Sequence, residues 1–185
     1  MSLIMCVDPG PEQSAFVTVR PDPDAPGGLV ITAFSIAPNA VIRQDIWKFA
    51  ISQDSHRIVF EQVACMGLAV GAEVLETCVW TGRFMEVFES AWHVTAHRIP
   101  RVPIKVHLCG SARAKDANVR QALIDRFGGQ KALQKAKAPK VNRKGEVVSH
   151  KVLAGPLAGI SSHCWSALAL ACVYVDRMKM GEFHE

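Results

Sequence analysis

The sequence of 185 residues lacks the marks of a membrane or secreted protein. It has no run of about 18 apolar residues, the length that a membrane-spanning helix needs. The opening segment MSLIMCVDPG has no basic start and reaches an acid at position 8, so it does not have the pattern of a signal peptide. We therefore expect a cytoplasmic protein with no membrane partner.

Paired cysteines are also lacking. The six cysteines form no Cys-x-x-Cys pair, and most of them lie in apolar segments, where cysteine is usually a small buried side chain. A structural zinc site is therefore not expected, and reduced thiols fit the cytoplasm. Because 49% of the residues are hydrophobic, a chain of this size can form a full core without disulfides. We find no internal repeat and predict a single domain over residues 1–185.

Acidic residues are scarce in one part of the chain. Residues 101–151 hold thirteen Lys and Arg against three acids, a net charge of +10, whereas the rest of the chain carries −6. A basic region of this kind favours a polyphosphate partner, because each neutralised phosphate releases counterions. The alternative is a solvated charge run that binds nothing. Within this region, residues 130–152 are rich in Lys and show little periodicity, which predicts an exposed basic loop.

The apolar pattern predicts a mixed sheet with helices on its faces. Strands are expected at residues 2–8, 15–20, 29–36 and 57–63, the first three as an antiparallel meander. Two more strands are expected at VTAHRI (94–99) and VPIKVHL (102–108). Helices are expected at residues 39–54, 68–92, 116–129 and 163–178. Gly82 inside the long second helix suggests a close backbone contact there.

Two acids lie where open α/β sheets carry their sites, at the ends of strands. Asp8 ends the first apolar strand and precedes Pro-Gly, although a turn-forming Asp would show the same pattern. Glu61 ends the apolar run IVFE in a strand expected to be buried, where an unpaired acid is costly. Two carboxylates at strand ends predict a site for a hard cation, Mg²⁺ or Mn²⁺.

The last predicted helix can contribute to the same site. His163 lies in its first turn, and Ser166 follows one turn later on the same face. A histidine at a helix start is more often structural than functional. His163 therefore matters for the site only if this helix packs against the strand that ends in Asp8.

The segments VDPG, FEQV and HCWSALALA resemble the RuvC-type Holliday-junction resolvases, and their phage-borne relatives in particular. The resemblance covers most of the chain, including TGRF (81–84) and KDANVRQALIDRFGG (115–129). It implies an α/β protein with the ribonuclease H-like fold. That fold has a mixed five-stranded sheet, its first three strands antiparallel, with helices on both faces.

The resemblance also implies a cation site of four side chains. Asp8, Glu61 and His163 match three of them, both as catalytic residues and as ligands of Mg²⁺ or Mn²⁺. Ser166 stands where the family usually has Asp, and a serine adds no charge to hold a second cation. Three other acids are candidates for the missing one: Asp116, Glu73 and Glu76.

The function implied is a divalent-metal-dependent endonuclease that hydrolyses DNA phosphodiesters at branched DNA such as Holliday junctions, in recombination and repair. A symmetric junction needs two active sites, which implies a homodimer. Lys115 falls near a family lysine that contacts phosphate, and the residues expected to bind DNA are Arg83, Arg113, Lys115, Lys137, Lys140, Arg143 and Lys144.

Two other functions stay open at the level of sequence. One is a catalytically weak or inactive nucleic-acid-binding module on the same fold, which Ser166 favours. The other is a sugar-kinase-like ATPase, whose sheet also opens with an acid near a glycine. That enzyme needs a second domain and Gly-rich phosphate loops, and this chain supplies neither.

Overall fold

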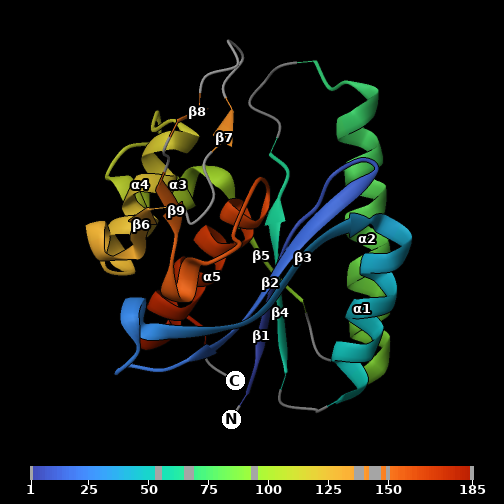
Figure 1. Cartoon of the computed structure of the whole chain (residues 1–185). Helices are drawn as coiled ribbons and strands as arrows, with labels where there is room; N and C mark the ends of the chain where they lie inside the picture. Colours follow the sequence, from blue (N-terminus) through green and yellow to red (C-terminus); the bar gives the residue numbers. More distant parts are fainter. Residues whose placement is uncertain are drawn as a thin grey trace.

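A mixed five-stranded sheet forms the centre of the molecule (Figure 1). In spatial order its strands are β3 (Leu29–Pro38), β2 (Gln13–Pro21), β1 (Ile4–Asp8), β4 (Arg57–Gln62) and β5 (His97–Pro100). Strands β1, β2 and β3 pair antiparallel, whereas β4 runs parallel to β1 and β5 runs parallel to β4. The computed structural model describes residues 2–52, 56–64, 69–92, 96–135, 140–141, 147–148 and 151–183.

The central strand β1 is buried on both faces because its residues alternate between two hydrophobic cores. Ile4 and Cys6 belong to one core, and Met5 and Val7 belong to the other. Such a strand reads as a continuous apolar run rather than an alternating one. The run ends at Asp8, whose position at the strand end leaves it only partly buried.

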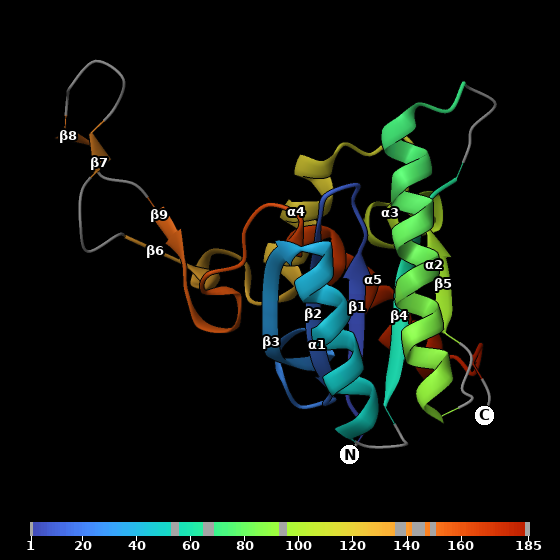
Figure 2. The same ribbon diagram turned by 90° about the vertical axis from the view of Figure 1, so that its right-hand side faces the viewer.

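Helices cover both faces of this sheet (Figures 1 and 2). One face carries α1 (Asn39–Ser52) and α2 (Ala72–Trp92), and the other carries α3 (Arg101–Cys109), α4 (Asp116–Arg126) and α5 (Cys164–Lys179). Helix α5 is buried from Cys164 to Val175, with Ser166 as the one partly exposed residue in that stretch. The predicted α/β architecture, a mixed five-stranded sheet with helices on both faces, is confirmed. None of the described helices is long and apolar enough to cross a membrane.

Two short ribbons precede α5 in the chain. Strand β6 (Leu133–Lys135) pairs antiparallel with β9 (Lys151–Leu153), and β7 (Lys140–Val141) pairs with β8 (Val147–Val148). Figure 2 shows both ribbons extending away from the central sheet. They lie in the segment predicted as a basic loop. Three short 3-10 helices complete the described elements: Pro26–Gly28, Gly129–Ala132 and Gly155–Leu157.

The prediction of a strand at residues 102–108 is wrong, because these residues form helix α3. Their apolar side chains alternate as in a strand, but Ile104 is also four residues before Leu108, which is the spacing of one helix face. Ile104 is fully buried and Leu108 packs against the same core, whereas Val106 is exposed. Pro103 lies in the first turn of the helix, where a missing N–H costs little. Tertiary packing therefore selects the helical period.

The prediction of a close backbone contact at Gly82 is also wrong. Gly82 lies on the exposed side of α2, and a Cβ atom added there would meet no atom within 4 Å. The residue has neither a steric nor a conformational reason to be glycine at this position.

Candidate active site

Asp8 and Glu61 lie next to each other at the ends of two parallel strands. The register pairs Val7 of β1 with Phe60 of β4, so the two acids are the next residues along each strand. Neighbouring strands are about 4.8 Å apart. The side chains alternate along each strand, so Asp8 shares a face with Cys6 and Glu61 shares it with Val59. Both acids therefore face the core that contains α5.

The start of helix α5 contacts the first of these acids. His163, the N-cap residue of α5, has its Nδ1 atom 3.2 Å from Oδ2 of Asp8. The Ser166 side chain also lowers the pKa of Asp8. The helix is held in this place because it packs along β1 and β2 through the buried residues that follow. The condition on His163 is thus met, and Ser166 supports Asp8 where an acid would repel it.

Arg101 contacts the second acid. It is the first residue of α3 and follows β5, the strand next to β4. Its Nη1 atom donates to Oε2 of Glu61 at 3.0 Å, and its Nη2 atom donates to Oδ1 of Asp116 at 2.7 Å. Asp116 is the first residue of α4, and Lys105 of α3 lies 3.8 Å from the same Oδ1 atom. The guanidinium group therefore bridges two acids from different elements.

Burial and charge act against ionisation of both strand-end acids. Each side chain is only 15% exposed. Burial raises the pKa of Asp8 above its usual range, although His163, Arg101 and Ser166 all lower it. Burial and the nearby charge of Asp8 raise the pKa of Glu61 to about 7, although Arg101 lowers it. Two like charges this close favour a cation between them.

The donor chemistry of this pair fits a hard divalent cation. Two carboxylates supply the oxygen ligands that Mg²⁺ and Mn²⁺ prefer, and His163 can supply a nitrogen. Among the described residues, however, no group of three or more His, Cys, Asp and Glu side chains is arranged around one point as a metal site. The Glu61 carboxylate accepts a hydrogen bond from Arg101 in this arrangement. The assignment of Asp8, Glu61 and His163 as ligands stays a prediction.

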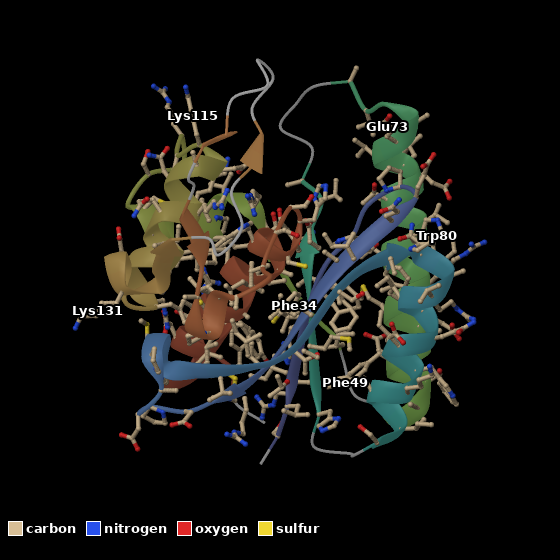
Figure 3. The ribbon with its side chains drawn as sticks, in the orientation of Figure 1. Phe34, Phe49, Glu73, Trp80, Lys115 and Lys131 are labelled. Carbon is tan, nitrogen blue, oxygen red and sulfur yellow. The ribbon has the colours of Figure 1, made fainter. Side chains whose placement is uncertain are left out.

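Of the three acids suggested in place of a fourth carboxylate, Asp116 is the one that reaches the site, through Arg101. Glu73 and Glu76 lie on α2, which packs on the opposite face of the sheet from α5. Figure 3 shows Glu73 on the side of the molecule opposite Lys115. The two glutamates are exposed there. Their distance from the α5 face argues against a role as ligands beside Ser166.

The residues predicted to bind DNA fall in different places. Arg113 and Lys115 are exposed between α3 and α4, and Lys115 lies at the end of the molecule to which the β4 arrow points (Figures 1 and 3). Arg83 lies on α2, where its guanidinium covers the Trp80 ring at 4.8 Å. Lys140 begins the short strand β7. The remaining three lie outside the described residues: Lys137, Arg143 and Lys144.

A cavity of about 460 Å³ opens beside the site. Arg101 and Asp116 line one side of it, and His163 and Ser166 line another. Trp165 and Arg120 also line it, with the guanidinium of Arg120 4.9 Å from the centre of the Trp165 ring. The cavity therefore gives a ligand access to Arg101 and His163, which contact Glu61 and Asp8.

Arg101 was not among the predicted site residues. No motif marks it, and in the sequence it is one of many basic residues. The one available signal was its place just after a predicted strand, close to the strand end as Glu61 is in β4. Its role depends on β5 pairing with β4, which the sequence did not show.

No protein-family model and no curated protein sequence matches this chain. Among solved structures, the chain is similar to RuvC of Thermus thermophilus, with a TM-score of 0.67 at 13% identity, over 97% of this chain and 96% of that one. The same values hold for T. thermophilus RuvC in complex with a Holliday junction substrate. A Fowlpox virus resolvase in complex with Holliday junction DNA matches with a TM-score of 0.42 at 10% identity, over 95% and 98% of the two chains. The similarity to RuvC establishes the ribonuclease H-like fold of this chain.

Proposed function

We propose that this protein is a divalent-metal-dependent endonuclease that cleaves branched DNA. The observation that carries the proposal is the pair of buried carboxylates, Asp8 and Glu61, at adjacent strand ends of a RuvC-like fold. An acid pair of this kind is costly in a purely structural site, because burial raises the pKa of both acids and the charge of Asp8 raises that of Glu61 further. A bound cation offsets that cost.

The side chains around this pair have separate roles. Asp8 and Glu61 would hold Mg²⁺ or Mn²⁺, with His163 as a third ligand. When bound, such a cation supplies positive charge and Lewis acidity for the hydrolysis of a phosphodiester. Ser166 lowers the pKa of Asp8 and so favours the ionised carboxylate. His163 is exposed at the mouth of the site, where it can also meet the substrate.

The DNA would lie across the end of the molecule at which the site opens. Arg113 and Lys115 are exposed there, and the basic segment 130–152 follows α4 in the chain. Contacts of this kind bind phosphates rather than bases, so we expect little sequence preference in affinity. We propose a four-way junction as the substrate, in line with the RuvC neighbour that is complexed with one.

We also propose that the protein acts as a homodimer, because two strands of a junction must be cut. The exposed apolar residues of α1 and α2 are candidates for the interface: Val41, Trp47, Ile51, Leu75 and Val79. Sedimentation of the parent and of a Leu75→Glu, Val79→Glu variant tests this. A parent that sediments as a monomer at micromolar concentration would contradict it.

A catalytically weak or inactive DNA-binding module is the second candidate. Ser166 is the observation that favours it, since the site has one acid fewer than the resolvase pattern. The effect of Ser166 on the pKa of Asp8 argues for a supporting role of this serine instead. The cleavage assay below distinguishes the two functions.

The test is cleavage of a labelled four-way junction in Mg²⁺ and in Mn²⁺. The parent should cut the junction, and Asp8→Asn should cut it at least about 10³-fold more slowly while binding it equally well. Asp22→Asn is the control, because Asp22 is an acid in the loop after β2, far along the strand from the site. Junction binding without cleavage by the parent in either metal would favour the inactive module.

A further inference from the structure

Arg101 is an unusual component of a site for divalent cations, because a fixed positive charge competes with a metal for the same carboxylate. Its side chain is 24% exposed, and it is anchored at both ends of its guanidinium, by Glu61 and by Asp116. Guanidinium groups held by two carboxylates keep one orientation, because the planar fork fits both partners. Arg101 is therefore a positioned charge rather than a mobile surface side chain.

The charge of Arg101 acts on every acid of the site. Its guanidinium donates to Glu61 at 3.0 Å and to Asp116 at 2.7 Å, and Asp8 ends the strand next to that of Glu61. Asp116 is itself 80% exposed, so its effect on Arg101 is weakened by solvent. The buried Glu61 is the stronger partner. Arg101 thus supplies to Glu61 the neutralising charge that a second cation would otherwise supply.

The sequence departs from the four-acid pattern in a way that also makes the site less negative. Ser166 takes the place of one acid, which removes one negative charge, and Arg101 adds one positive charge beside Glu61. Each change weakens the electrostatic attraction for a second divalent cation.

We propose that Arg101 is a built-in cation of the active site, which takes the place of one of two divalent metals and leaves a single metal position centred on Asp8. The inference rests on the proposed nuclease function and deepens it. In catalysis, Arg101 would hold Glu61 in place and present its remaining N–H groups to the scissile phosphate from the cavity that it lines. The alternative is a structural role, in which Arg101 only ties α3 and α4 to β4.

The experiment counts bound Mn²⁺ by the loss of the free-ion electron paramagnetic resonance signal, without DNA and without turnover. The parent should bind one Mn²⁺ per chain. Arg101→Gln removes the charge and should bind either two Mn²⁺ or one with at least about tenfold higher affinity, because the competing charge is gone. Arg101→Lys keeps the charge and should bind one, as the parent does.

Arg126→Gln is the matched control. Arg126 is buried to a similar degree and donates to both oxygens of Asp176, at 2.6 and 2.7 Å, in an ion pair away from the site. Its loss should lower thermal stability and leave Mn²⁺ binding unchanged. If Arg101 were only structural, Arg101→Gln would behave in the same way as Arg126→Gln.

The outcomes separate this inference from the proposed function. Two Mn²⁺ per chain in the parent, or unchanged binding in a folded Arg101→Gln, would overturn the role of Arg101 and leave the nuclease proposal intact. No Mn²⁺ bound by the parent would overturn both. If Arg101→Gln does not fold, the parent stoichiometry and Arg101→Lys decide, since two sites in either contradict the inference.

Discussion

The two faces of the central sheet differ in what they bury and in what they expose. On the face of α1 and α2 the core is apolar and aromatic, as in the stacked rings of Phe60 and Phe84, 6.4 Å apart. On the face of α5, the apolar core stops at the strand ends, where Asp8, Glu61 and Arg101 gather. Consecutive residues of one strand serve both faces, since Phe60 packs under α2 and Glu61 points toward α5.

This difference shows how one strand can place stabilising side chains on one face of the sheet and candidate catalytic side chains on the other. The side chains that hold the sheet to α1 and α2 can change without touching the acids, because each strand sends alternate residues to opposite faces. The acids on the other face lower the stability of the metal-free protein, because burial opposes their ionisation. Substitutions on the α1 and α2 face should therefore change mainly the free energy of unfolding, and those on the α5 face mainly the binding of metal and DNA.

The largest expected effect on stability is on the α1 and α2 face. Phe84→Ala removes a fully buried ring and should lower the free energy of unfolding by about 3–5 kcal/mol. Mn²⁺ affinity of the folded variant should stay within about twofold of the parent, since Phe84 faces away from the acids. Urea unfolding and Mn²⁺ titration measure the two quantities. A large loss of Mn²⁺ affinity would show that the faces are coupled.

A second variant tests the DNA side of the site. Replacing Lys137, Lys140, Arg143 and Lys144 by Ala should weaken binding to all DNA sequences alike, because phosphate contacts are lost. The slope of log affinity against log salt should become shallower by about one unit per lost contact, so by up to about four. A salt titration on one junction and one plain duplex measures the slope. The same slope is measured for Arg83→Ala, a substitution on the opposite face of the sheet, so that the two faces can be compared. Equal slopes in parent and quadruple variant would mean that the basic segment does not contact DNA.

The pH dependence of stability should report the buried acid. The pKa of Glu61 is about 7 in the folded protein, against an ordinary value of 4.5. Between these pH values the folded state holds a proton that the unfolded chain has released, so stability is lost as the pH rises from about 4.5 to about 7. Without metal, Glu61→Gln should therefore exceed the parent by about 1–3 kcal/mol at pH 8 and match it near pH 4.5.

Urea unfolding in a chelator at both pH values measures this difference. Adding Mg²⁺ at pH 8 should then stabilise the parent more than Glu61→Gln, because the variant has lost a ligand. A parent whose stability is the same at both pH values would contradict the raised pKa of Glu61.

The smallest expected effect is at an exposed position of α2. Gly82→Ala should raise the free energy of unfolding by about 1 kcal/mol, because alanine is the better helix former and the added Cβ meets no atom. Mn²⁺ binding should not change. Thermal unfolding checks the gain, and a loss of stability would mean that Gly82 has a contact in a dimer.

The sequence predicted the elements whose pattern is strong and local. The apolar run that ends at Asp8, the buried strand that ends at Glu61 and the apolar final helix all have one period and clear ends, so their positions are close to those observed. It also predicted that His163 and Ser166 share one face of that helix, and left open whether the face packs against the strand of Asp8. These inferences needed only strand alternation and helical spacing.

The rest depended on contacts between distant parts of the chain. Residues 102–108 fit both a strand and a helix, and only the packing of Ile104 and Leu108 decides between them. Arg101 lies beside Glu61 because β5 pairs with β4. Asp116 reaches the site and Glu73 does not, because their helices cover opposite faces of the sheet. Such tertiary relations are not encoded in a local pattern.

The most direct test of the account is a crystal of the parent soaked in Mn²⁺, with the metal located by anomalous scattering. We expect one strong peak, bound by oxygens of both Asp8 and Glu61 or by Asp8 with His163, and no such peak in Asp8→Asn. Strong Mn²⁺ density elsewhere on the protein, with none at Asp8 in the parent, would contradict the central claim that these strand ends form a metal-dependent active site.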